Sequence, residues 1–427
     1  YKEKISLLSG DIEAKSQDVH FMKFTKKGQG LLTNMLLQSQ NKQKDTINYH
    51  INISGASAKG TFHRQTINAI EGNQGPYQLR GINNETFIII LSGSERIYID
   101  GRLLTRGQDA DYIINYNSGE ITFTAKQPIT KDKRIVAEFE YSDFNYTRGL
   151  SHISTTIQKK KWDVSLHFYH EQDFKNQSNQ MDLTDENISF LQKIGNNIGD
   201  AYFPFADSTG YQINEILYKK IDTLVNGIFY DSVYIYSTNS DSAFYSLRFT
   251  LVGEGKGNYV LTKSAVNGRV YTWIAPIGGI PQGNYEPVIL LITPKRTQMY
   301  TVTFNYKLPK NTKIHIETAL SNNDMNTFSN IGNAQNIGIG LLFSLNNTLI
   351  LQKKKNIGKD IKWKMHSSLY YESKNKLFDY IENYRDVEFI RNFNLNDSMM
   401  NASEHYAGMS LLFDYKKIGR ASCRERV

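Results

Sequence analysis

The sequence predicts an all-β protein: a fragment of an antiparallel transmembrane β-barrel with two β-rich inserted extramembrane modules. Three observations lead to this prediction. Apolar and polar residues alternate with a period of two, as in strands that have one apolar face. Many alternating segments approach the ~9 to 11 residues that a tilted transmembrane strand needs. Tyrosine or tryptophan recurs near the ends of their apolar faces, where interfacial aromatic girdles lie.

Composition agrees with an ordered β protein. Hydrophobic residues make up 40% of the 427, and 27 tyrosines and 22 phenylalanines against 8 prolines exclude disorder and collagen. No apolar stretch approaches the ~18 to 20 residues that a membrane-spanning helix needs, which excludes a helical membrane protein. A soluble β protein and a β-barrel remain, and the length alone does not choose between them.

The segment Ile418–Val427 is predicted to be foreign, because it resembles the translation of a common sequencing adapter. Cys423, the only cysteine, lies in it, so neither disulfides nor thiol catalysis are predicted elsewhere. The segment carries three arginines and one glutamate, and its exclusion lowers the net charge from +8 to +6. The lysine runs Lys159–Lys161 and Lys353–Lys355 fall where strands would turn, so we interpret them as solvated hairpin ends rather than a nucleic-acid surface.

The alternating and non-alternating segments divide the chain into blocks. We predict barrel-type strands in 1–74, a first β insert in 75–143, a barrel-type hairpin in 144–177, a connector in 178–222, a second β insert in 223–297 and barrel-type strands in 298–417.

The barrel-type blocks and the first insert differ in their pattern. Apolar and polar residues alternate over Ile47–Ile53 in the first block and over Trp162–Phe168 in the hairpin block. In the first insert, Phe87–Leu91 is apolar without alternation, which predicts a strand buried on both faces and a separate small core. Asp100-Gly101 and Ser118-Gly119 provide turn residues there.

In the connector, Thr184 is expected to cap a short helix that Gly195 ends, with Ile188, Leu191 and Ile194 on one face. The second insert contains four strand-like segments: Ser232–Tyr236, Phe244–Val252, Val270–Ala275 and Pro287–Ile292.

The last block has the clearest alternation. A strand over Tyr300–Leu308, a turn at Pro309–Asn311 and a partner strand are followed by strands over Ile337–Leu345, Ile361–Tyr371 and Ala407–Tyr415. The predicted lipid-facing residues are Tyr300, Val302, Phe304, Tyr306, Ile339, Leu341, Phe343, Trp363, Met409, Leu411 and Phe413. An antiparallel sheet with one face on a soluble core would give the same alternation.

Several residue groups suggest chemistry, and each has a simpler interpretation. Gly253–Gly257 resembles a phosphate loop, but a strand and not a helix follows it, which predicts a tight hairpin. Asp109 and Asp111, with Asp100, lack the spacing of a calcium loop and are interpreted as turn residues. Glu138 and Glu140 lie on one strand face, interpreted as solvated, and are not placed across a substrate as an acid–base pair would be.

The histidines and tryptophans give no stronger signal. His152, His167 and His170 are the nearest histidine group, and the last two lie on opposite strand faces, which argues against zinc. Trp162, Trp273 and Trp363 suit a carbohydrate platform, but girdle or core packing is the commoner role. We therefore predict a protein that is not an enzyme, with no catalytic, cofactor-binding or metal-binding residues.

Several segments resemble those of large outer-membrane surface proteins of the Bacteroidota and, more distantly, the giant translocon barrel of type IX secretion and gliding motility. The segments are Glu71–Tyr77, Leu91–Gly101, Asp109–Tyr112, Asn115–Ile121, Glu317–Ser321 and Asp324–Ser329. The resemblance implies an outer-membrane β-barrel with β-rich inserts and no active site.

The expected function is transport, protein secretion or cell-surface assembly in the outer membrane or at the cell surface. Expected partners are outer-membrane lipid and other surface or secretion proteins, with no nucleic acid and no cofactor. The alternative is a secreted or surface-anchored β-sandwich binding module or adhesin, whose sheets would have a soluble core.

Overall fold

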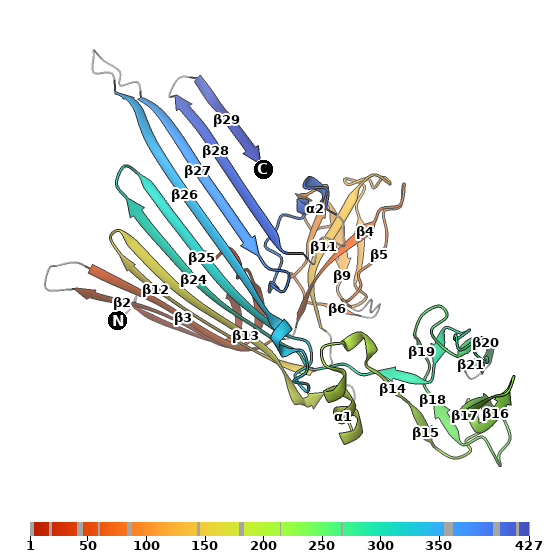
Figure 1. The fold of residues 1–427 in the computed structure, drawn as a ribbon. Helices are drawn as coiled ribbons and strands as arrows, with labels where there is room; N and C mark the ends of the chain where they lie inside the picture. The colour runs from red at the N-terminus through yellow and green to blue at the C-terminus, as the bar shows by residue number, and fades with distance from the viewer. Residues whose placement is uncertain are drawn as a thin grey trace. The chain divides into compact units, whose positions relative to one another are not determined.

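The fold is built almost entirely from antiparallel strands (Figure 1). The computed structural model describes residues 4–16, 19–40, 46–58, 60–82, 88–142, 146–178, 183–213, 215–265, 268–353, 362–395, 402–415 and 418–426. In these ranges, no helix is both long enough and apolar enough to cross a membrane. The chain forms two compact units, of which unit 1 comprises 1–182, 294–327 and 332–427, and unit 2 comprises 183–293 and 328–331.

Unit 1 contains the largest sheet, in which every neighbouring pair is antiparallel. Its strands in order are β1 (Ile5–Lys15), β2 (Thr25–Gln40), β3 (Thr46–Ala58), β12 (Tyr146–Lys159), β13 (Trp162–Ser178), β24 (Arg296–Leu308), β25 (Thr312–Asp324), β26 (Ile337–Lys353), β27 (Lys362–Lys374), β28 (Glu404–Tyr415) and β29 (Ile418–Arg426). The all-β antiparallel prediction is confirmed. The described strands do not close into a barrel, since β1 and β29 are the two edges. β29 consists of the residues attributed to the adapter, and ten strands precede it.

The two ends of this sheet differ in their connections. At the hairpin end, adjacent strands are joined across residues 41–45, 160–161, 309–311, 354–361 and 416–417. At the long-connection end, they are joined across 16–24, 59–145, 179–295, 325–336 and 375–403. The turns predicted at Lys159–Lys161 and Pro309–Asn311 are present, with Lys310 and Asn311 in the left-handed region. Lys354 and Lys355 lie outside the described residues.

The sheet has an apolar face and a polar face. The register pairs Tyr300 with Leu320 and Leu320 with Ile339, so these residues share the apolar face. Every predicted lipid-facing residue has a register position on this face. Most of their side chains are exposed or half-buried, and that of Trp363 lies outside the described residues, as does Ile361. The polar face carries Thr301, Glu317 and Glu372.

The first insert forms two small sheets within unit 1. Its strands are β4 (Thr61–Asn68), β5 (Tyr77–Gln78), β6 (Ile89–Ile90), β7 (Arg96–Ile99), β8 (Arg102–Leu103), β9 (Tyr112–Asn115), β10 (Glu120–Phe123) and β11 (Arg134–Ser142). The first sheet has the order β4–β11–β7–β8, and β6 also pairs with β11. The second sheet has the order β5–β10–β9. Because β4 pairs with β11, the insert begins near residue 61 and not at 75.

The separate core predicted for this insert is confirmed, with Ile97, Ile121, Ile135 and Phe139 among its buried residues. The prediction that Phe87–Leu91 forms a strand buried on both faces is wrong. Ile88 and Ile90 are buried but Ile89 is exposed, because β6 is a two-residue strand that presents one side to the core; Phe87 lies outside the described residues. The strand buried on both faces is β11.

The turns of the insert follow the prediction. Asp100 and Gly101 have φ of 50° and 79° between β7 and β8, and Gly119 has φ of 67° between β9 and β10. A positive φ at these positions is what hairpin turns between twisted strands require.

Unit 2 begins with the predicted helix. Helix α1 (Asp185–Ile194) is capped by Thr184, whose side chain accepts from the Asn187 amide, and it ends at Gly195 with φ of 63°. Phe328–Ile331 also belongs to unit 2, and the Ser329 hydroxyl donates to the carbonyl of Gln192. The 3-10 turns in the described residues are η1 (Ile198–Asp200) in unit 2 and η2 (Asn333–Asn336) in unit 1.

The rest of unit 2 consists of short strands around an aromatic core. Its strands are β14 (Tyr202–Pro204), β15 (Ala206–Ser208), β16 (Tyr218–Val225), β17 (Ile228–Tyr236), β18 (Tyr245–Leu247), β19 (Thr250–Leu251), β20 (Tyr259–Ala265), β21 (Gly268–Trp273), β22 (Tyr285–Glu286) and β23 (Val288–Leu290). They form three sheets, with the orders β15–β18–β16–β17, β19–β22–β20–β21 and β14–β23. The predicted connector and second insert are therefore one body, because β14, β15 and β16 pair with later strands. Gly253–Gly257 is not the predicted hairpin, since β22 lies between β19 and β20.

Two connections of unit 1 fold back onto the polar face at the long-connection end. We call residues 19–24 the β1–β2 loop and residues 375–395, which include α2 (Phe389–Asn392), the β27–β28 loop. Phe21 and Phe378 from these loops pack edge to face at 5.2 Å. They share a buried cluster with residues of the polar face, including Met299, Ala319 and Leu342.

The first prediction concerns Gly338 of β26, against which the β27–β28 loop packs. A Cβ at this position would lie 2.2 Å from the Cα of Phe378. Gly338→Ala is expected to displace the loop and to lower the free energy of unfolding by about 1–3 kcal/mol. Urea unfolding and the rate of proteolysis within 375–395 measure both effects. Gly408→Ala in β28 is the control, because a Cβ there meets nothing within 4 Å; equal effects of the two variants would contradict the prediction.

Candidate functional site

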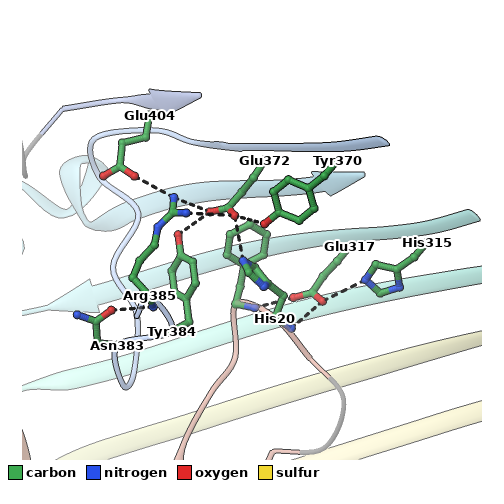
Figure 2. A network of polar contacts seen from close by, with 10 residues as sticks. His20, His315, Glu317, Tyr370, Glu372, Asn383, Tyr384, Arg385 and Glu404 are labelled. Carbon is green, nitrogen blue, oxygen red and sulfur yellow. Dashed lines mark hydrogen bonds and ion pairs between the residues drawn. The ribbon is translucent and has the colours of Figure 1, made fainter. Parts of the chain in front are cut away.

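The candidate site is a network of buried charges on the polar face, where the two loops meet the sheet (Figure 2). Its centres are Glu317 of β25 and Glu372 of β27, whose exposed fractions are 0% and 1%. A buried carboxylate is costly unless partners satisfy its oxygens. Both carboxylates receive those partners from the β1–β2 loop and the β27–β28 loop.

Glu317 binds the backbone of the β1–β2 loop. Its two carboxylate oxygens accept hydrogen bonds from the amides of His20 at 2.9 Å and Phe21 at 2.8 Å. Nε2 of His315, the next residue on the same face of β25, lies 3.7 Å from this carboxylate. Charge-assisted bonds to two successive amides fix the position of the loop as well as its orientation.

Glu372 joins both loops to the sheet. Its carboxylate lies 2.7 Å from Nη2 of Arg385 and accepts from the Tyr384 hydroxyl at 2.9 Å. Nε2 of His20 lies 3.1 Å from the same carboxylate, and the Tyr370 hydroxyl donates to it. Arg385 continues to Glu404 at the start of β28, at 3.0 Å. Removal of any one of these partners would leave the buried Glu372 carboxylate incompletely paired.

Burial also changes the ionisation of groups in the β27–β28 loop. The pKa of Tyr384 is raised by burial and by the neighbouring Glu372 charge, so the hydroxyl stays protonated as a donor. Burial likewise raises the pKa of Glu382, although its carboxylate accepts from the Thr25 amide at 2.6 Å. The ionised form of Glu382 is therefore disfavoured in the folded protein relative to the unfolded chain.

The interpretation of Glu138 and Glu140 as a solvated pair is wrong. Both are buried, because the β11 face that carries them is covered by the start of β2 and by the β27–β28 loop. Glu140 pairs with Nζ of the buried Lys26 at 2.7 Å. Glu138 pairs with Arg64 of β4 and lies 3.2 Å from Nε of Arg96. Arg64 and Arg96 belong to the insert itself, so the pair of Lys26 and Glu140 is the one of these three that joins the insert to the rest of unit 1. Arg96 also lies 3.4 Å from Glu382 of the β27–β28 loop.

The aspartates considered for calcium act in separate turns. Asp100 accepts from the Arg134 amide at 3.1 Å, and Asp111 accepts from the Thr105 amide at 2.8 Å. Over the part of the chain that the structure describes, no three histidine, cysteine or acidic residues are grouped as metal ligands would be.

The three histidines do not form one group, and neither do the described tryptophans. His152 and His167 stack on the polar face with ring centroids 6.3 Å apart, while His170 has its register position on the apolar face. Trp162 pairs with Tyr306 at the hairpin end. Trp273 packs on Tyr230 inside unit 2, so the described tryptophans form no common platform.

Sequence reasoning did not find this network. No role was predicted for His20, Glu317, Glu372 or Arg385. The His20 amide and its acceptor Glu317 are 297 residues apart in the chain, so no local pattern reports their contact. Glu317 and Glu372 are each the one acidic residue on the polar face of their strand, but these faces also carry lysine and histidine, so no specific signal was present in the sequence.

The comparisons with known proteins identify one segment. Residues 62–143 match the model of a domain of unknown function (DUF8818), and this range coincides with the first insert from β4 to β11. No curated protein and no solved structure matches the chain.

The second prediction tests the Glu317 anchor. Glu317→Gln removes the charge and one of the two acceptor oxygens, so one buried amide of the β1–β2 loop loses its partner at a cost of about 1–3 kcal/mol. Hydrogen exchange at the His20 and Phe21 amides should accelerate while exchange in β24 stays slow. Glu13→Gln, at an exposed position of β1, is the control and should leave both amides protected. Unchanged protection in Glu317→Gln would show that the carboxylate does not hold the loop.

The third prediction follows from the raised pKa of Glu382. A raised carboxyl pKa gives a contribution to stability that is complete below the ordinary carboxyl range and is lost as pH rises through the folded pKa. Glu382→Gln cannot ionise, so its stability relative to the wild type should rise between acidic and neutral pH. Urea unfolding of both proteins across this range measures the difference. A relative stability of Glu382→Gln that falls with rising pH would reverse the sign and contradict the burial argument.

Proposed function

We propose that this chain is part of a non-enzymatic outer-membrane β-barrel protein that serves transport, protein secretion or cell-surface assembly. The observation that supports this most is the inverted burial of the largest sheet. Leu166, Ile339 and Met409 on the apolar face are 51%, 53% and 49% exposed, whereas Thr301 and Glu317 on the polar face are 1% and 0% exposed.

A sheet in a soluble protein packs its apolar face on the core and leaves its polar face in water. The present sheet has the opposite arrangement. Its apolar face extends from β12 to β28 through Ile153, Leu166, Val302, Leu341 and Phe413, all exposed. An apolar surface that continues across so many strands fits contact with lipid, and a polar interior fits the lumen of a barrel.

The asymmetry of the connections supports the same proposal. Outer-membrane barrels have short turns on the periplasmic side and longer loops on the outer side. All five connections at the long-connection end of the sheet would then lie on the outer side, including both inserts. The resemblance of the insert segments to large outer-membrane surface proteins agrees with this orientation.

A closed barrel requires pairing partners for both edges of the sheet, from further strands or from other copies of this chain. β1 and the last strand are edges whose free backbone groups cannot remain unpaired in lipid. In the closed barrel, the β1–β2 loop and the β27–β28 loop would lie in the lumen and narrow it. The network of Glu317, Glu372 and Arg385 would hold that constriction in place.

The fourth prediction compares the two faces of β26. Leu341→Lys places a charge on the apolar face, where lysine near the bilayer midplane costs about 2–4 kcal/mol. Expression with an outer-membrane signal should show loss of the variant from the membrane fraction. Asn346→Lys, at an exposed position on the polar face of the same strand, is the matched control and should assemble as the wild type does.

The alternative binding module predicts a different result. The wild-type chain would then remain in the aqueous fraction without detergent, and Leu341→Lys would keep it there or improve its solubility. Recovery of the wild type from the aqueous fraction in a folded state would contradict the membrane proposal.

A further inference from the structure

The polar face contains a second feature, which begins beside Glu317 at its register partner Thr303 and extends over the neighbouring strands. A cavity of about 610 Å³ lies over five consecutive strands of the sheet, β2, β3, β12, β13 and β24. Its volume falls within the range of small-molecule sites. Neither the anchoring of the loops nor the closure of a barrel accounts for its chemistry.

We propose that this cavity binds an uncharged polyhydroxyl compound, of the saccharide class, on the lumen side of the sheet. The proposal rests on the proposed function in one respect: the polar face is a lumen only if the barrel closes. The ligand class follows from the side chains that line the cavity.

The lining combines polar groups with the apolar residues Met35, Leu36 and Ile51 and is almost free of charge. Amides, hydroxyls and imidazoles predominate; they belong to Asn34, His50, Asn52, Ser154, Thr156, Gln158, Ser165, His167, Thr303 and Asn305. Asp163 is the one charged residue of the lining, and its carboxylate already accepts from Nδ2 of Asn305 at 2.7 Å. An anionic ligand would lack an opposite charge in this cavity, a cationic ligand would find only Asp163, which is already bonded to Asn305, and an apolar ligand would leave the amides unpaired.

The lining groups are oriented by bonds to one another and keep capacity for a ligand. Nδ2 of Asn52 donates to Oδ1 of Asn34 at 2.6 Å, and the hydroxyls of Thr156 and Ser165 are 2.9 Å apart. An amide has two donor hydrogens and an acceptor oxygen with two lone pairs, so one such bond leaves further sites. Hydroxyl groups, which both donate and accept, match a surface of this mixed character.

His167 provides an independent indication of a ligand. Its side chain lines the cavity and is only 7% exposed, and among the described residues its Nδ1 has no hydrogen-bond partner. A buried imidazole nitrogen without a partner costs free energy, and such groups in native structures call for an explanation. Nδ1 is shielded from the cavity as the ring lies, so a ligand hydroxyl would supply the missing partner once the imidazole turns over.

The fifth prediction is tested first on the unaltered chain. Isothermal titration of the full chain in detergent with maltose, gluconate and glucosamine compares a neutral saccharide with an anionic and a cationic sugar derivative. We expect saturable binding of maltose, at least tenfold tighter than that of either charged compound. Absence of saturable maltose binding up to its solubility limit, or equal binding of a charged compound, would overturn the proposal.

Variants locate the site. His167→Phe and Thr303→Val should each weaken maltose binding about fivefold, as the loss of one hydrogen bond does. His170→Phe is the matched control, because His170 is on the same strand with its register position on the opposite face, and maltose binding should be unchanged. Unchanged binding in both cavity variants would overturn the location, and the nearly isosteric Thr303→Val keeps the test valid if His167→Phe does not fold.

Membrane assembly is measured separately on the same samples. A chain that assembles in the membrane but does not bind maltose retains the proposed function and loses this inference. A folded chain that binds maltose but partitions into the aqueous phase retains the cavity as a saccharide site and loses the barrel.

Discussion

The constraint on which this structure depends is that its largest sheet buries polar groups. A face that carries Thr301, Glu317 and Glu372 cannot be covered by apolar side chains alone, because each buried oxygen then needs a partner. The β1–β2 loop meets this requirement by presenting two backbone amides to Glu317, and the β27–β28 loop by presenting Arg385 to Glu372. The apolar residues Phe21 and Phe378 then pack between these polar contacts. Hydrogen bonds therefore set the position of the loops, and packing completes it.

The same constraint explains how the first insert is attached. Both faces of β11 are buried, one against the core of the insert and the other against the start of β2 and the β27–β28 loop. On the second face, Glu140 pairs with Lys26 of β2, whereas Glu138 pairs with Arg64 and Arg96 of the insert, and Arg96 continues to Glu382 of the β27–β28 loop. Buried ion pairs give little net stability over apolar contacts, but a misplaced partner is expensive. Such pairs favour one orientation of the insert over other orientations of similar packing.

The sequence was sufficient for features that depend on local order. Alternation located the strands from Tyr300 to Tyr415 and their apolar face, and the Thr184 cap with Gly195 located α1. It failed where pairing is distant: β4 joins the insert through β11, and β14 to β16 pair with later strands of unit 2. Glu138 and Glu140 have the alternation of a solvated face, since a face covered by other charges has the same pattern as a face in water. The network around Glu372 depends on loops that have no periodicity of their own.

Charge is distributed unevenly along the polar face, and this distribution links the network to the cavity. The paired charges of Glu317, Glu372 and Arg385 lie where the two loops cross the face, near the long-connection end. The cavity lining begins at Thr303, the register partner of Glu317, extends over the neighbouring strands and is nearly neutral. Charges bound to loops are already satisfied, so they add little affinity for a solute. Neutral amides and hydroxyls on rigid strands keep unused bonding capacity. In the proposed barrel, the loops therefore determine how wide the passage is, and the strands beside them determine which solutes bind within it.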